Sequence, residues 1–93
     1  MVVASLELDI SLLESHSLKD KRRIVRSLKE KIRSRFNVSV AEVDDHDLWQ
    51  RAKLGVAVVA ADGGRATELL DKVGRFAEGD MRLVVLVAPV EFR

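Results

Sequence analysis

Two segments of helical periodicity, each placed between strand-like segments, constrain the fold of this chain more than any other feature. Strand-like segments alternate apolar and polar residues or are continuously apolar, whereas the two helical segments repeat apolar residues every three or four positions. The predicted elements are a strand near 2–13, a helix near 18–36, strands near 38–43 and 53–61, a helix near 64–78 and a strand near 81–88. The order is therefore β-α-β-β-α-β, two β-α-β halves in tandem.

The first strand and the first helix have the clearest patterns. The apolar residues between positions 6 and 12 alternate with polar ones, which predicts a strand with one buried face. Ser17 is a good N-cap for the helix that follows, and Asp20 places a carboxylate in its first turn. The apolar stripe of this helix consists of Leu18, Val25, Leu28, Ile32 and Phe36.

The second half contains more irregular signals. The alternation in the second strand slips between Val40 and Ala41, which predicts a β-bulge at that point. Gly79 is expected to stop the second helix, and Pro89 is expected to end the fourth strand.

These elements predict an α+β fold of the ferredoxin-like class, formed by one domain over residues 1–93. Right-handed crossovers place both helices on one face of a four-stranded antiparallel sheet with the strand order 4-1-3-2. The third and fourth strands are apolar on both faces, so the open face of the sheet should be partly apolar. We therefore expect a homodimer joined through the open faces or the fourth-strand edges, although Glu7 and Asp9 argue against a fully dry interface.

The net charge of +1 conceals a strong segregation of charge along the chain. The segment from Lys19 to Arg35 contains nine basic and two acidic residues, which gives it a charge of +7. The remainder contains seven basic and thirteen acidic residues and therefore carries −6. This asymmetry indicates one basic surface on the first helix.

A basic ridge follows from the helical positions of these charges. Six basic side chains fall on one flank of the first helix, between about 40° and 160° from Val25. At 1.5 Å per residue the ridge is about 21 Å long, which matches three or four successive phosphates of a nucleic-acid backbone. The alternative is a solvated face whose cations pair with acidic neighbours, as Glu30 would with Arg26 or Arg33. The six residues of the basic ridge are Lys19, Arg22, Arg23, Arg26, Lys29 and Arg33.

An acidic cluster and the single tryptophan lie between the second and third strands. Asp44, Asp45, His46 and Asp47 offer oxygen and imidazole groups, but their spacing matches no metal-binding loop. We therefore expect no metal site there. Trp49 is expected either to cap the core or to contact a partner.

Composition excludes several functional classes. The chain has no cysteine, so thiol chemistry and disulfides are excluded, and a reducing cytoplasm is the expected location. Its apolar runs are too short to span a bilayer, so we expect no membrane association. Many ionic residues and few side-chain amides are typical of thermophilic proteins. No catalytic constellation is recognisable, which favours a binding protein without a cofactor over an enzyme.

The segment Ser17–Ala60 reads SLKDKRRIVRSLKEKIRSRFNVSVAEVDDHDLWQRAKLGVAVVA. This segment resembles the YlxP-like family of small bacterial proteins of unknown function, and the similarity continues through LLDKV at Leu69–Val73. The resemblance implies a ferredoxin-like fold. Genes of that family tend to lie near those for transcription-elongation, translation-initiation and ribosome-maturation factors, which implies an RNA or ribosome context. The family supplies no agreed activity, so the resemblance assigns no site.

The basic ridge and the implied gene context together predict a non-enzymatic module that binds RNA or a ribosomal subunit. Two other classes stay open at this stage. One is a homodimeric scaffold that binds protein and has no nucleic-acid role. The other is a small-ligand regulatory domain, which rests on analogy between folds alone.

Overall fold

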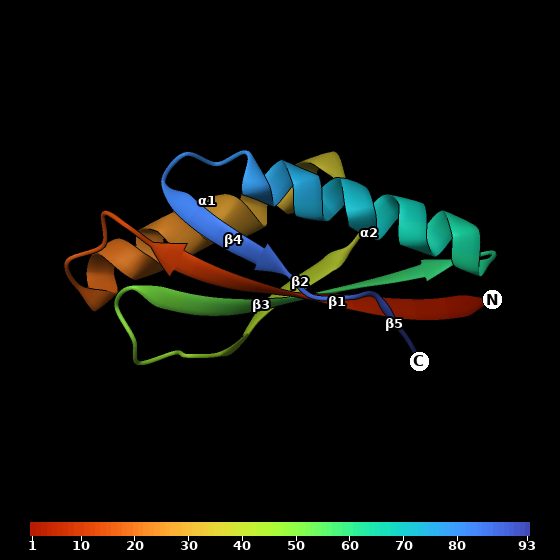
Figure 1. Cartoon of the computed structure of the whole chain (residues 1–93), viewed down its shortest axis with the longest axis horizontal. Helices are drawn as coiled ribbons and strands as arrows, with labels where there is room; N and C mark the ends of the chain where they lie inside the picture. The colour runs from red at the N-terminus through yellow and green to blue at the C-terminus, as the bar shows by residue number, and fades with distance from the viewer.

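The computed structural model describes residues 1–93 and contains the predicted elements in the predicted order (Figure 1). Each predicted boundary lies within two residues of the observed one. The elements are β1 (Val2–Leu12), α1 (Leu18–Arg35), β2 (Ser39–Asp44), β3 (Arg51–Ala60), α2 (Gly63–Glu78), β4 (Leu83–Val87) and β5 (Glu91–Phe92).

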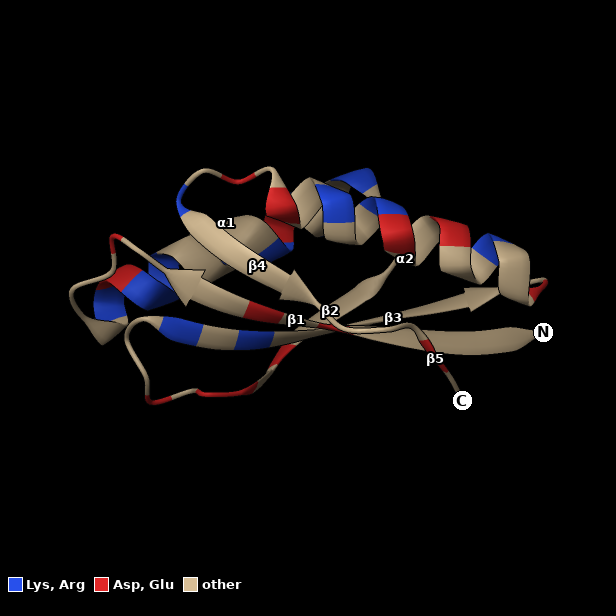
Figure 2. Ribbon diagram, in the orientation of Figure 1, with Lys and Arg blue, Asp and Glu red and all other residues tan.

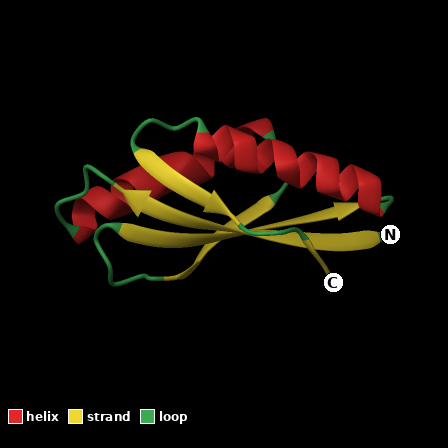
Figure 3. Cartoon of the chain, in the orientation of Figure 1, coloured by secondary structure: helices red, strands yellow, loops and turns green.

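The strands form one antiparallel sheet in the order β2-β3-β1-β4, which is the predicted 4-1-3-2 arrangement seen from the other edge. Both helices cover the same face of the sheet, and the opposite face is open (Figure 3). The ferredoxin-like α+β fold is therefore confirmed. Neither helix combines the length and apolar character needed to cross a membrane.

The core lies between the sheet and the two helices. Alternation along β1 and β3 turns every second side chain toward the helices, because successive strand residues point to opposite faces. Most of these inward residues belong to one cluster of 19 buried side chains. Its members include Leu6, Leu8, Ile10 and Leu12 from β1, Leu54 and Val56 from β3, Leu28 and Ile32 from α1, and Leu70 and Val73 from α2.

The β-bulge of β2 lies two residues later than the sequence predicted. The pairing with β3 is regular through Val40 and Ala41 and shifts only between Glu42 and Asp44. The prediction was wrong because Glu42 is treated as an outward residue when only apolar alternation is considered. In the structure Glu42 follows Val40 onto the helix side of the strand, where it pairs with a lysine of α1.

A short fifth strand is present that periodicity did not predict. Pro89 interrupts the pairing of β4 with β1, as expected of a residue without a backbone N–H. The chain then returns to β1, and β5 pairs with Ala4 and Ser5. The last residue continues this pairing, because Arg93 donates its backbone N–H to the carbonyl of Val3 at 2.8 Å.

The open face of the sheet carries both apolar and charged side chains. Val59 on β3 and Val84 and Leu86 on β4 are exposed large apolar residues. The central strand β1 separates them with a polar row, in which Asp9 lies 3.8 Å from the ammonium of Lys53. The face is therefore partly apolar, with exposed apolar residues on both β3 and β4.

The turn before β4 is fixed by an ion pair. Arg82 donates two side-chain hydrogen bonds to the carboxylate of Asp80, at 3.0 and 2.7 Å. These bonds hold the pKa of Asp80 below its ordinary value and raise the pKa of Arg82. The pair stays charged at neutral pH and defines where the edge strand β4 begins.

Candidate nucleic-acid interface

The orientation of α1 determines where its charges point. The hydroxyl of Ser17 accepts a hydrogen bond from the backbone N–H of Asp20, so the helix begins with the predicted N-cap. Its buried face packs on the sheet and includes Ile24 and Val25. Because this apolar face fixes the rotation of the helix about its axis, the flanking basic residues are turned toward solvent.

The basic ridge is exposed and largely free of acidic partners. Figure 2 shows basic bands along α1 and acidic residues in the loop after β2. Five ridge residues are exposed and Lys29 is half-buried. Only Arg23 forms an ion pair, with Asp20 at 3.9 Å. Glu30 pairs with neither Arg26 nor Arg33, so the ion pairing of the ridge is limited to Arg23 with Asp20.

The C-terminal end of the ridge reaches the edge of the sheet. Arg33 donates a hydrogen bond through Nη2 to the carbonyl of Val40 at 2.6 Å. Val40 lies on β2, which is an edge strand, so this bond occupies a backbone acceptor at that edge. Lys19 lies in the first turn of α1 and Arg33 in its last turn, so the ridge runs the length of the helix.

A second group of cations lies between the helices and has a structural explanation. Lys31, Arg35 and Arg75 line a groove of about 690 Å³ where both helices end. The guanidinium of Arg35 lies 4.9 Å from the centre of the Phe76 ring, a cation–π contact. Cations are also favoured at helix C-termini, because the last carbonyls carry partial negative charge. These two contacts explain why cations gather in the groove, and no bound anion is needed to account for them.

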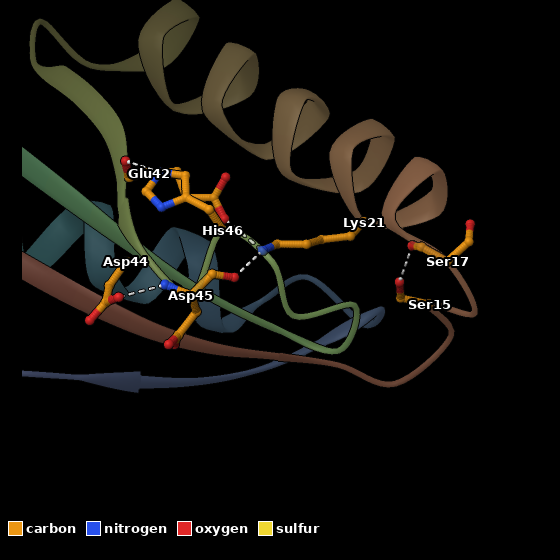
Figure 4. Close-up of polar contacts among 7 residues, drawn as sticks. All are labelled: Ser15, Ser17, Lys21, Glu42, Asp44, Asp45 and His46. Atoms are coloured by element: carbon orange, nitrogen blue, oxygen red, sulfur yellow. Dashed lines mark hydrogen bonds and ion pairs between the residues drawn. The ribbon is translucent and has the colours of Figure 1, made fainter.

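Lys21 is the one basic residue of α1 that is buried, with 1% of its side chain exposed. Its ammonium lies 2.8 Å from Oε2 of Glu42 and donates a hydrogen bond to the carbonyl of Asp45 (Figure 4). Glu42 Oε2 is itself buried and has no other partner. Lys21 thus fastens the first turns of α1 to the end of β2 and to the loop that follows it.

Sequence reasoning missed the role of Lys21, although a signal was present. Lys21 precedes Val25 by four residues and Leu28 by seven, so it falls inside the buried stripe. Its position, and not its residue type, predicts burial. A lysine within an apolar stripe indicates an acidic partner on the facing element, which is Glu42 here.

The side chains of the acidic cluster form hydrogen bonds within their own loop. Asp44 accepts a hydrogen bond from the backbone N–H of Asp45 at 2.8 Å, and His46 Nε2 lies 3.2 Å from the carbonyl of Glu42 (Figure 4). Asp45 has a φ of 62°, the left-handed conformation that Asp tolerates better than most residues. No three His, Asp or Glu side chains converge as a metal-binding group.

The absence of a metal site in this cluster stays a prediction. Calorimetric titration of Mg²⁺, Mn²⁺ or Zn²⁺ into the protein is expected to show no stoichiometric binding of micromolar affinity, because the carboxylates do not converge. Stoichiometric binding that disappears in Asp45→Ala would contradict the prediction.

Trp49 is not part of the core. Its side chain is 53% exposed, and the neighbouring Leu48 is 47% exposed. Of the two expectations for this residue, the core cap is therefore wrong. The exposed indole stays a candidate for contact with a partner.

These features define a small ferredoxin-like domain with an exposed basic helix and an exposed tryptophan loop. The chain belongs to the family described as "Protein of unknown function (DUF503)", which matches residues 3–89. It is also similar to the uncharacterized protein YlxP of Bacillus subtilis (strain 168), with 29% identity over 72 residues. That similarity covers 77% of this chain and 78% of the Bacillus protein, and the predicted resemblance to YlxP-like proteins is confirmed.

Proposed function

We propose that this protein is a non-enzymatic module that binds RNA, free or within a ribosomal subunit, through the basic ridge of α1. The observation that carries the proposal is a row of six cations on one helix flank, five of them exposed and one half-buried, of which only Arg23 has a carboxylate partner. Unpaired guanidinium groups at helical spacing offer paired donors to successive phosphates. Binding through phosphates positions the protein on RNA without reading its sequence.

The aromatic residues support contact through the helix and not through the sheet. Domains of similar topology that recognise RNA stack bases on aromatic residues of their central strands. Here Phe36 and Phe76 pack against each other with ring centres 5.8 Å apart, and Phe92 lies beside Gly63 at the start of α2. The central strands β1 and β3 contain no aromatic residue. The central strands therefore offer no stacking surface, which leaves α1 as the element that contacts the RNA phosphates.

The proposal is tested by co-sedimentation of the tagged protein with ribosomal subunits at two salt concentrations, with and without nuclease. We expect the protein to pellet with subunits at low salt and to be released by high salt or by nuclease, because phosphate contacts weaken steeply with ionic strength. If the protein neither pellets with subunits nor binds free RNA at near-physiological salt, the proposal is wrong.

A second candidate function, a homodimeric scaffold, is favoured by the edge strand β4. All five residues of β4 are apolar, and Leu86 has 68% of its side chain exposed. Ala88 donates to the carbonyl of Glu7, and Leu13 donates to the carbonyl of Arg82. Because hydrogen-bonded pairs alternate in an antiparallel ladder, the backbone groups of Val85 and Val87 face the free edge, whereas the N–H of Leu83 already donates to the carbonyl of Asp80. No residue of β4 is itself charged, whereas on the opposite edge strand β2 Arg33 bonds to the carbonyl of Val40.

Antiparallel pairing of β4 with the same strand of a second copy would satisfy these groups by two-fold symmetry. We expect light scattering to give the mass of a dimer at tens of micromolar, and the mass of a monomer for Val84→Lys with Leu86→Lys, because edge lysines oppose strand pairing. Both replaced side chains are exposed, so circular dichroism should show an unchanged fold. A monomeric parent at that concentration would contradict the prediction.

A further inference from the structure

The exposed loop between β2 and β3 is attached at both ends to the start of α1. At its beginning, the carbonyl of Asp45 accepts the hydrogen bond from Lys21. At its end, Gln50 donates through Nε2 to the carbonyl of Ser15 at 3.2 Å, and its own carbonyl accepts from the backbone N–H of Leu12 at 2.9 Å. Ser15 lies in the connection that leads into α1. The loop is therefore held in a fixed place although its side chains face solvent.

This attachment places the Trp49 loop at the same end of the molecule as the N-terminal end of the basic ridge. Trp49 directly precedes Gln50, which is bonded to Ser15, and the first ridge residue Lys19 follows Ser15 by four positions. Lys19 and Arg22 are exposed in this part of α1. One end of the molecule therefore combines an exposed indole with unpaired cations.

The loop also encloses a shallow hollow with several kinds of chemical groups. The hollow has a volume of about 420 Å³ and is open to solvent, so it offers a surface for a flat group and not an enclosed cavity. The indole offers a flat apolar face, Asp47 a hydrogen-bond acceptor, and Arg51 a cation, since neither charged side chain forms an ion pair. The hollow is lined by Asp47, Leu48, Trp49, Gln50 and Arg51.

We propose that this hollow takes one unpaired nucleotide of the RNA whose backbone lies along the basic ridge. The base stacks on Trp49, its polar edge bonds to Asp47 or to the amide oxygen of Gln50, and Arg51 neutralises the adjoining phosphate. The inference rests on the proposed function and adds to it the class of RNA. A base can reach the indole only when it is not stacked in a duplex, so the preferred ligand is a single strand or a loop.

The test uses the fact that Trp49 is the only tryptophan of a chain that has no tyrosine, so the intrinsic fluorescence reports on this loop alone. Short oligouridylate, an RNA duplex of equal length and inorganic polyphosphate are titrated in turn. Oligouridylate is expected to quench the emission, because the base stacks on the indole. Duplex and polyphosphate should bind the ridge and leave the emission nearly unchanged.

The affinity of fluorescently labelled RNA is measured for variants of Trp49 in parallel. Trp49→Ala should weaken single-strand binding by at least about fivefold, since stacking on one aromatic side chain contributes that much or more. Trp49→Phe keeps an aromatic ring and should lose much less, and duplex binding should be equal in all three proteins. The melting temperature should not change, because the side chain lies outside the core.

Two failures are distinguishable. If labelled single strands bind but neither quench Trp49 nor respond to Trp49→Ala, the nucleotide site is overturned and the ridge function survives. If no RNA binds, the ridge function fails and the nucleotide site fails with it. An emission shift produced by poly-glutamate but not by RNA would assign the hollow to an acidic protein segment and would overturn the inference.

Discussion

Lys21→Met is expected to lower the free energy of unfolding by about 3 kcal/mol, a large share of the stability of a small domain. The substitution keeps most of the apolar stem but removes the ammonium that lies 2.8 Å from Glu42 Oε2. A carboxylate with 18% of its side chain exposed is then left without a counter-charge, and the carbonyl of Asp45 loses its donor. Urea denaturation followed by far-UV circular dichroism should show a midpoint lower by about 1 to 3 M.

Lys19→Met is the matched control for this prediction. Lys19 lies two residues earlier on the same helix but is exposed, so its replacement should change stability by no more than about 0.5 kcal/mol. Adding Glu42→Met to Lys21→Met should recover much of the loss, because an apolar pair of similar volume often replaces a buried ion pair at little cost. Equal stability of Lys21→Met and Lys19→Met would show that Lys21 is not a buried charge partner.

The fold followed from the sequence because its elements have simple apolar periods. The even-numbered residues of β1 face the helices and the odd-numbered ones face the open side, so one alternating row identified both the strand and its buried face. The strand order then followed from chain order and the handedness of β-α-β connections. Short connections and five continuously apolar residues in β4 left few other arrangements.

The errors arose where a charged residue takes an inward position. Lys21 and Glu42 each occupy an inward position on their own element. Each charge is tolerated there because the other neutralises it. Apolar periodicity on a single element treats both as outward, which shifted the predicted bulge to Val40 and hid the role of Lys21. Which of the 15 acidic residues faces Lys21 depends on the packing of α1 on β2, and no local pattern contains that information.

The ridge shows the same division between local and long-range information. Helical spacing placed Arg22 and Arg26 on an exposed flank, and the structure confirms their exposure. Whether acidic residues elsewhere neutralise such a flank depends on tertiary structure. The attachment of the Trp49 loop to the start of α1 was likewise beyond the sequence, because it is formed by Asp45 and Ser15 through backbone carbonyls.

Arg22→Glu with Arg26→Glu is expected to weaken RNA binding at least tenfold at near-physiological salt. The parent should show a slope of log affinity against log salt of about −3 to −4, because four or five neutralised phosphates each contribute about −0.7 to −0.9. The double variant loses two of these contacts, so its slope should be shallower by about 1.5. Anisotropy of labelled RNA over a series of salt concentrations measures both quantities.

Arg65→Glu with Lys72→Glu is the matched control, since it changes the net charge by the same amount on exposed positions of α2. Both parent side chains there pair with acidic neighbours, Asp62 and Glu68, and neither belongs to the ridge. This control should bind RNA with nearly the parental slope, because it leaves every proposed phosphate contact in place. A general dependence on net charge would instead weaken both double variants alike.

The fold should survive in the ridge variant, because Arg22 and Arg26 are exposed and form no ion pair. Affinities for RNAs of different sequence should fall together, since phosphate contacts do not distinguish bases. A folded Arg22→Glu/Arg26→Glu protein that binds RNA and ribosomal subunits as the parent does would identify the ridge as a solvated face. The edge strand β4, with its free backbone groups around Val85, would then be the better guide to function.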